Sequence, residues 1–445
     1  MNDEKRQLKP YHGIILFILV ILTFLFVAFP IQIKLGLYGV LVTELIILAM
    51  SVIPAILLKA DLKEVFPIKI PKLRQILGVI VLWIGGLILV TLVTLIIGYF
   101  FPEGLLEVSS SIQSVFTSVP AVVSFLIVAG SPAICEEALM RGFILSSFKG
   151  LKNRWLIVFI MGLIFGIFHL DPYRFLPTAI LGAFLTYIMI ETKNILLPAL
   201  YHFINNGFST LVSFLSPTNA TNAGAQMYVP LVTIGVYLIL AAAVPFIILL
   251  GAWLLHDKKE KAGQEGLPYI DPTEKAKEKK RRLIRVLTAT GLAVVLFVAG
   301  FAVTITEAIG MLKPAVQCDM SFDINKDTES QIIPFDIQSA GTYVADYIIE
   351  NKRGLIDVQI INEEGEVLYQ FSCLSMNSNG NEMQLTPGKY QVVIDFVMED
   401  IEEYYENMGY DFDESTRADF NLTGDLTQMT PFRFKMTMNN KLLQY

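Results

Sequence analysis

The chain has 445 residues, of which 54% are hydrophobic and only 17% are charged. Soluble domains average about 25% charged residues, so this composition argues against a soluble protein and favours a membrane protein. The sequence has no clustered basic face with interleaved aromatic residues, so nucleic acid is not expected as a partner.

The net charge of −7 combines two parts of opposite sign. Residues 313–445 hold 23 Asp and Glu against 9 Lys and Arg, whereas residues 1–312 hold 18 acidic and 25 basic residues. The sequence therefore predicts a basic membrane part followed by an acidic C-terminal domain. Three cysteines are too few for a disulfide scaffold.

Nine apolar stretches come close to the roughly 20 residues that a helix needs to cross a bilayer. The first follows Lys5, Arg6 and Lys9 and is not closed by a small-residue cleavage site, so we expect it to be retained as a span. The expected fold class is an all-α polytopic membrane helical bundle of about nine spans with a C-terminal extracytoplasmic β-sandwich-like domain. The predicted spans are residues 12–30, 35–58, 76–101, 119–147, 154–170, 174–191, 195–215, 229–255 and 284–311.

The distribution of Lys and Arg among the connections predicts the orientation of the chain in the membrane, because these residues are enriched in cytoplasmic loops. Under a nine-span count, the basic connections 59–74, 149–154 and 256–285 all fall on the side of the N-terminus. The alternate connections are poor in positive charge, and Arg174 is the single basic residue of one of them. We therefore expect an integral protein of a bacterial plasma membrane, with a cytoplasmic N-terminus and the C-terminal domain outside.

Four domains are expected from these patterns. Their bounds are 1–255 for a transmembrane helical domain, 256–283 for a charged cytoplasmic linker, 284–312 for a last transmembrane helix and 313–445 for an acidic extracellular β-rich domain.

The C-terminal domain shows strand-like segments, TYVADYIIE, LIDVQIIN, EVLYQFS and YQVVIDF, separated by turn signals such as NKRG and TPGK. This alternation favours a small β-sandwich. The acidic stretch 399–414 is interpreted as an exposed loop or helix, since it lacks the spacing of a calcium-binding loop. Whether Cys318 and Cys373 form a disulfide stays open, because the sequence does not give their distance.

The fourth predicted span, which contains SPAICEEALMRGFILSSF, carries two carboxylates and a guanidinium. A charged side chain at the centre of a bilayer costs about 2.5–3.5 kcal/mol on insertion scales, and packing gives no reason for three of them. Glu137 and Arg141 are four residues apart and share a helix face, so we expect an ion pair. Glu136 is rotated by about 100° and points elsewhere.

Two later spans add polar residues at the same spacing. FGIFHLDP places Phe165 four residues before His169. YHFINNGF places His202 four residues before Asn206, with Asn205 as a competitor for the same role. These side chains increase the number of polar residues within predicted spans that are otherwise apolar.

Each piece alone has a structural interpretation. Glu137 and Arg141 would form a structural ion pair, a lone histidine would be a packing residue with a hydrogen bond, and Cys135 would be a small packing residue rather than a nucleophile. The patterns EExxxR, FxxxH and HxxxN occur in this order on three spans, however, and this order favours a joint site.

The segments EEALMR, FGIFH and HFINN resemble the three motifs of the CPBP intramembrane proteases, whose eukaryotic members are the type II CAAX prenyl proteases. The resemblance covers about residues 75–215 and implies a glutamic endopeptidase in which Glu136 activates the attacking water. The external β domain goes beyond the family core. The implied catalytic residues are Glu136, His169, His202 and Asn206, and the implied structural or orienting residues are Glu137, Arg141 and Phe165.

The chemistry suits these residue types. A glutamate in an apolar cavity is a stronger base toward water than one in solution, and an Asn or His donor can hold a developing oxyanion. Zinc held by a glutamate and two histidines is an alternative, but HExxH is missing and the resemblance favours a reaction with no metal and no cofactor. The expected partners are a protein or peptide substrate, membrane lipid and an extracellular partner of the C-terminal domain.

Two other functions are compatible with the sequence. One is a non-catalytic membrane scaffold or bacteriocin-immunity-type protein on the same fold. The other is a transporter or proton relay, suggested by Glu44 and Glu307 inside predicted spans, although no internal repeat is visible. Glu44 would either line a cavity or lie in a tilted or shifted span.

Overall fold

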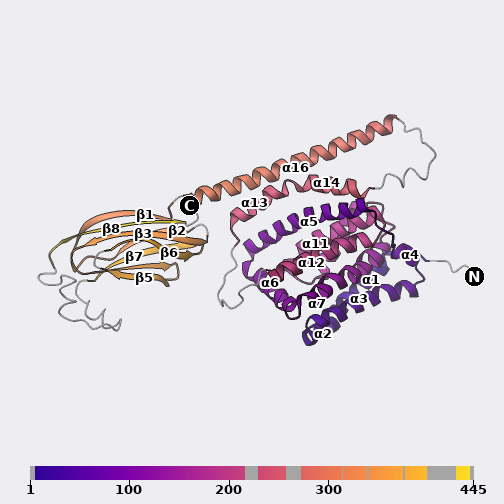
Figure 1. Ribbon diagram of the computed structural model, residues 1–445, viewed down its shortest axis with the longest axis horizontal. Helices are drawn as coiled ribbons and strands as arrows, with labels where there is room; N and C mark the ends of the chain where they lie inside the picture. Colours follow the sequence, from indigo (N-terminus) through magenta and orange to yellow (C-terminus); the bar gives the residue numbers. More distant parts are fainter. Residues whose placement is uncertain are drawn as a thin grey trace, which may run out of the picture. The chain divides into compact units, whose positions relative to one another are not determined.

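The chain divides into two compact units, Met1–Thr304 and Ile305–Tyr445 (Figure 1). Each of them has a hydrophobic core of its own. The structure, a computed structural model, describes residues 6–215, 229–256, 272–312, 314–337, 340–373, 376–397 and 427–440.

The first unit is built from helices (Figure 1). The N-terminal helices are α1 (Pro10–Thr23), η1 (Phe24–Ala28), α2 (Phe29–Leu35), α3 (Leu37–Leu57), α4 (Leu62–Val65), α5 (Leu73–Phe100) and α6 (Pro102–Thr117). The fourth predicted span consists of α7 (Ala121–Phe125), η2 (Leu126–Gly130), α8 (Ser131–Glu137), η3 (Ala138–Ile144) and α9 (Leu145–Ser147). The later helices are α10 (Arg154–Phe168), α11 (Pro172–Thr192), α12 (Leu196–Leu215), α13 (Leu231–Ala241), α14 (Val244–Leu255) and α16 (Pro272–Leu312).

Seven helical stretches of the described residues are long and apolar enough to cross a membrane. Helices also lie at the other two predicted spans, but α10 has only 15 residues. The second exception, α12, is a continuous helix of 20 residues, but its sequence includes the polar residues His202, Asn205 and Asn206. The polytopic helical bundle is thus confirmed, whereas the count of nine spans and the extracytoplasmic place of the β domain stay predictions.

Two connections differ from the expectation. Residues 102–117 form the helix α6 rather than a loop, because Pro102 at its first position and Glu103 in its first turn favour a helix start. The predicted linker 256–283 already becomes helical at Pro272, where α16 begins. The remaining part of that linker lies outside the described residues, as do the uncharged stretch 216–228 and the acidic stretch 399–414.

Helices α10 and α11 pack at close range because glycines lie in their contact. A Cβ atom on Gly162 would lie 2.8 Å from the carbonyl oxygen of Ala179, and one on Gly182 would lie 2.6 Å from Cβ of Phe165. Small residues let two helix backbones approach closely, as is common in membrane bundles. This approach positions the backbone of Gly182 for the site described below.

The second unit contains two four-stranded antiparallel sheets, with strand orders β1-β8-β3-β6 and β2-β7-β4-β5 (Figure 1). Side chains of both sheets share one core, and along β8 the buried residues alternate, as in Phe432, Phe434 and Met436. The predicted β-sandwich is confirmed. The strands are β1 (Val316–Ile324), β2 (Gln331–Ile337), β3 (Gly341–Asn351), β4 (Leu355–Asn362), β5 (Val367–Cys373), β6 (Met376–Leu385), β7 (Gly388–Val397) and β8 (Thr430–Asn440).

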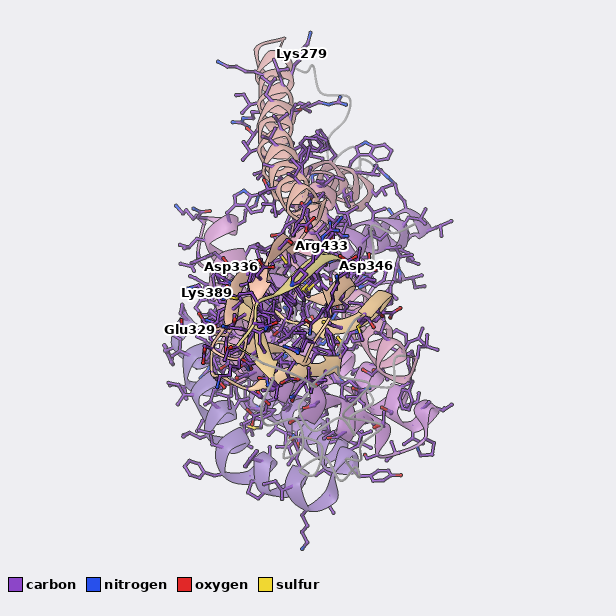
Figure 2. The ribbon with its side chains drawn as sticks, turned by 90° about the vertical axis from the view of Figure 1, so that its left-hand side faces the viewer. Lys279, Glu329, Asp336, Asp346, Lys389 and Arg433 are labelled. Atoms are coloured by element: carbon purple, nitrogen blue, oxygen red, sulfur yellow. The ribbon has the colours of Figure 1, made fainter. Side chains whose placement is uncertain are left out.

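The second unit contains an ion pair between two neighbouring strands and two cysteines. Arg433, labelled in Figure 2, donates two hydrogen bonds of 3.3 Å to Asp319 on the neighbouring strand. These bonds hold the pKa of Asp319 below its usual range. Cys318 and Cys373 lie in different sheets and both are free thiols, so the disulfide left open by the sequence is not formed.

Candidate active site

The charged cluster of the fourth span is buried inside the helical unit. Only 8% of Glu136, 1% of Glu137 and none of Arg141 is exposed. The two glutamates end α8, and Arg141 lies in the wider π-helical turn of η3 that follows. Single π-helical turns inside α-helices are frequent at functional sites. His202 from α12 joins the cluster and is 2% exposed.

Arg141 is held by three groups at once. Its Nη1 atom lies 3.1 Å from Oε1 of Glu137, which is the ion pair expected from the spacing. Its Nη2 atom donates a 3.0 Å hydrogen bond to the carbonyl oxygen of Gly182 on α11. The guanidinium also lies over the ring of Phe165, 4.6 Å from its centroid. A buried ion pair stabilises a fold only with such additional partners, so Arg141 fixes Glu137 in one geometry.

His202 connects the two glutamates. Its Nδ1 atom lies 2.9 Å from Oε1 of Glu137, and its Nε2 atom lies 3.9 Å from Oε2 of Glu136. An ionised carboxylate can only accept a hydrogen bond, so Nδ1 of His202 donates to Glu137 and Nε2 is the ring atom that faces Glu136. The 3.9 Å separation between Nε2 of His202 and Oε2 of Glu136 is too long for a direct hydrogen bond.

Glu136 is the less satisfied of the two carboxylates. Its Oε2 atom is buried and accepts no hydrogen bond from any residue that the structure describes. Its charge interacts favourably with His202, Arg141 and Arg174 and unfavourably with Glu137. A buried carboxylate with a free oxygen and nearby positive charge can accept a proton from water.

His169 ends α10 and is half-buried beside aromatic rings. Its ring contacts those of Phe165 and Phe168, with centroids 5.0 and 5.7 Å away. Its Nδ1 atom lies 2.9 Å from the carbonyl oxygen of Phe165, which can only accept, so Nδ1 carries the proton and Nε2 is the basic atom. The ring is also within electrostatic range of His202 and Arg174.

The chain turns sharply directly after His169. Leu170 has a φ of +52°, a region that costs a leucine conformational energy and that is often found beside functional sites. Asp171 then caps α11 by accepting hydrogen bonds from the backbone of Tyr173 (2.9 Å) and Arg174 (3.2 Å). This cap places Arg174 in the first helical turn, next to the site.

Asn206 lies one helical turn from His202, as predicted, but its amide is directed to the backbone of the fourth span. Its Nδ2 atom donates a 3.1 Å hydrogen bond to the carbonyl oxygen of Val128 in η2, and Asn205 donates to Oδ1 of Asn206 at 3.3 Å. An amide nitrogen has two hydrogens. Asn206 therefore ties α12 to η2 through one of its two amide hydrogens.

Two side chains near the site were not assigned to it from the sequence. Glu44 on α3 is 4% exposed and its carboxyl group contacts that of Glu136. Arg174 was assigned to a loop, although the Asp-Pro pair before it is a helix-start signal that would have placed it on α11.

Cys135 is buried close to both Glu44 and Glu136. Glu307 lies on α16 in the second compact unit.

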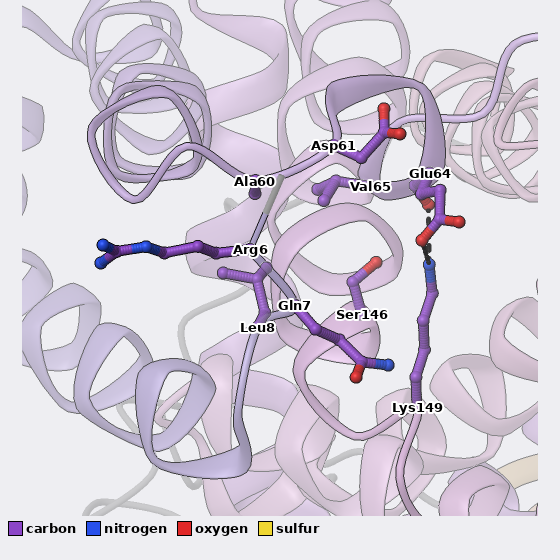
Figure 3. Close-up of a pocket in the computed structure, with 9 residues that line it drawn as sticks. All are labelled: Arg6, Gln7, Leu8, Ala60, Asp61, Glu64, Val65, Ser146 and Lys149. Carbon is purple, nitrogen blue, oxygen red and sulfur yellow. Dashed lines mark hydrogen bonds and ion pairs between the residues drawn. The ribbon is translucent and has the colours of Figure 1, made fainter. Parts of the chain in front are cut away.

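A cavity of about 290 Å³ lies elsewhere on the helical unit (Figure 3). None of the cluster residues lines it, and Lys149 at its edge is bound to the carbonyl oxygen of Glu64 (3.1 Å) and its carboxylate (3.4 Å). Its lining residues are Arg6, Gln7, Leu8, Ala60, Asp61, Glu64, Val65, Ser146 and Lys149. Among the described residues, no three His, Cys, Asp or Glu side chains are grouped so that they could hold a metal ion.

Comparison with known proteins agrees with the motif assignment. Residues 118–208 match the family model of the type II CAAX prenyl endopeptidase Rce1-like proteins. This segment contains the charged cluster and both histidines of the site, so the resemblance to the CPBP proteases is confirmed there. No curated protein and no solved structure matches the chain. The chain thus carries a segment similar to a family of membrane proteases.

Proposed function

We propose that this protein is an intramembrane endopeptidase that hydrolyses a peptide bond with a water molecule activated by Glu136. The observation that carries the proposal is the buried oxygen of Glu136, which faces Nε2 of His202 at 3.9 Å inside the segment that matches the protease family. An ionisable side chain inside an apolar membrane bundle marks a functional site by default, and here a carboxylate oxygen and a histidine nitrogen face each other.

The proposed reaction starts from a water molecule bonded to Glu136 and Nε2 of His202. Glu136 takes a proton from this water as its oxygen attacks the carbonyl carbon of the substrate, and the C=O electron pair moves onto the carbonyl oxygen. The second N–H of Asn206 stabilises that oxyanion. When the carbonyl re-forms, the C–N bond breaks and Glu136 returns its proton to the leaving amine.

In this proposal the remaining residues orient His202 and the attacking water. Glu137, fixed by Arg141 and Phe165, holds His202 in the tautomer that turns its lone pair toward the water. His169 offers a second basic nitrogen from the end of α10 and shares the proton with the same water. The enzyme then needs no metal and no cofactor.

The substrate in this proposal is a protein or peptide segment that enters the bundle from the membrane. We further propose that the N-terminus is cytoplasmic, that the membrane is a bacterial plasma membrane, and that the β-sandwich lies outside and binds a partner there. The unequal distribution of Lys and Arg among the connections supports this orientation.

The test uses the full chain in lipid vesicles with a set of prenylated and unprenylated peptides in ¹⁸O-labelled water. We expect cleavage that leaves one ¹⁸O atom in the new carboxylate, unchanged by a metal chelator and absent in Glu136→Gln. The exposed Glu103→Gln variant on α6 is the matched control and should cleave normally. Equal cleavage by Glu136→Gln and the control would contradict the assignment of Glu136 as the base, whereas no cleavage by the unaltered chain would favour a non-catalytic protein.

A further inference from the structure

We infer that Glu44 is a positioning residue that shares one proton with Glu136 and thereby keeps Glu136 ionised and oriented as the base. This inference rests on the proposed function and extends it to a residue on α3 that no motif contains. Glu44 then acts through Glu136 and does not itself touch the substrate.

Glu44 and Glu136 lie on two helices, α3 and α8, that pack against each other. Glu44 lies near the middle of α3, and this helix packs against α8 and η3. The side chain is 4% exposed, and its carboxyl group is in hydrogen-bond contact with that of Glu136. Two carboxyl groups from separate helices therefore meet in the interior of the bundle.

Each of the two carboxyl groups has a buried oxygen to which no described residue donates a hydrogen bond. Oε2 of Glu44 and Oε2 of Glu136 are both buried, and neither accepts a hydrogen bond from the described residues. Ionised carboxylates have only acceptor atoms, so neighbouring carboxylates repel each other and leave acceptors unsatisfied. One proton between the two groups removes the repulsion and makes one of them a donor to the other, while an oxygen of the remaining carboxylate stays available to a water molecule. A carboxylic acid paired with a carboxylate is thus the stable state of this site.

The charges around the pair decide which member keeps the proton. The groups that face Glu44 from α8 are Glu136 and the thiol of Cys135. Glu136 instead interacts with the positive charges of Arg141 and Arg174 and with His202, besides the negative charge of Glu137. Positive charge favours the ionised form, so Glu136 is the carboxylate and Glu44 is the acid.

A protonated Glu44 has two effects on the base. Its O–H donates a hydrogen bond to Glu136, which stabilises the ionised form against the apolar surroundings. The same bond fixes the rotation of the carboxylate, so that the geometry toward His202 is retained. Without this donor, the apolar surroundings favour the protonated form of Glu136, which cannot accept a proton from water.

The experiment compares two variants of the full chain. Glu44→Gln keeps a donor of similar shape, whereas Glu44→Leu removes it, and kcat/KM is measured against pH with the peptide that the unaltered protein cleaves. We expect the acidic limb of the Glu44→Leu profile to move by about one unit or more to higher pH, with about a tenfold loss at neutral pH that is regained at alkaline pH. The Glu44→Gln limb should stay close to that of the unaltered protein.

Superimposable pH profiles for all three proteins, whatever their absolute rates, would overturn the inference and leave Glu44 a structural residue. Loss of the proposed function looks different, because then Glu136→Gln cleaves as well as the unaltered protein. If Glu44→Leu does not fold, infrared spectroscopy of the other variants tests whether Glu44 is protonated. The C=O band of a protonated carboxylic acid should be present at neutral pH, absent in Glu44→Gln and present in Glu103→Gln; its persistence in Glu44→Gln would also overturn the inference.

Discussion

His202 and Glu137 are joined by a 2.9 Å contact between Nδ1 and Oε1, and the same carboxylate oxygen lies 3.1 Å from Nη1 of Arg141. Glu137 therefore holds a cation on one side and a histidine on the other. The contact determines which nitrogen of His202 faces Glu136, so the second glutamate of the motif controls the surroundings of the first.

Glu137→Gln should reduce both stability and activity. The substitution leaves buried Arg141 without the carboxylate that it contacts directly, which costs about 3–5 kcal/mol of unfolding free energy. It also lets His202 adopt the other tautomer, so kcat should fall with little change in KM. Denaturant unfolding and peptide cleavage in the same detergent measure both effects.

The double variant Glu137→Gln with Arg141→Met distinguishes the two roles. It removes both charges, so it should be more stable than Glu137→Gln alone, while its activity stays low because His202 is still not oriented. A double variant as unstable as the sum of the single variants would show that the buried pair does not couple.

Gly182→Ala should weaken the contacts that hold Arg141 in place, namely its hydrogen bond to the carbonyl oxygen of residue 182 and its contact with the ring of Phe165. The new methyl group would lie 2.6 Å from Cβ of Phe165, so α10 and α11 would have to separate, at about 1–3 kcal/mol of unfolding free energy. The carbonyl oxygen that accepts from Arg141 and the ring beneath its guanidinium would both shift, and kcat/KM should fall. Gly150→Ala is the matched control, because a Cβ atom there has no neighbour within 4 Å. Equal melting temperatures and rates for the two variants would refute this packing argument.

Cys373 should react slowly with alkylating reagents at neutral pH. Burial raises the pKa of its thiol to about 11, and the thiolate is the reactive form. Below that pKa the thiolate fraction grows about tenfold per pH unit, so the alkylation rate should rise about tenfold with each unit between pH 7 and 10. Peptide-resolved mass spectrometry of the alkylated chain measures the rate. A rate at pH 7 equal to that of a free cysteine peptide, or a disulfide to Cys318, would contradict the structure.

The sequence predicted what depends on local geometry. The i, i+4 spacing of Glu137 and Arg141 predicted their ion pair, and alternating apolar residues predicted the strands of the sandwich. The contact of Glu137 with His202 depends on how α12 packs against α8, and no pattern within either helix contains that information. For the same reason Glu44 stayed ambiguous, since its direction follows from the rotation of α3.

Other differences came from weak or overlooked local signals. The polar residues of α12 that point to a site also lower its hydropathy, so counting spans by apolarity is least reliable at the candidate site. Arg174 was placed in a loop although Asp171 and Pro172 form a helix start before it. The amide of Asn206 could not be assigned to Val128 because the π-helical turn of η2 that presents that carbonyl was not predicted.

The most direct test of the account is the ratio of kcat/KM for Glu136→Gln and Glu103→Gln, measured on one peptide at one pH with both variants shown to be folded. Removing the base while keeping the shape of its side chain should lower the rate by at least about a hundredfold. The exposed glutamate of α6 should be dispensable. A ratio near one would contradict the assignment of Glu136 as the base.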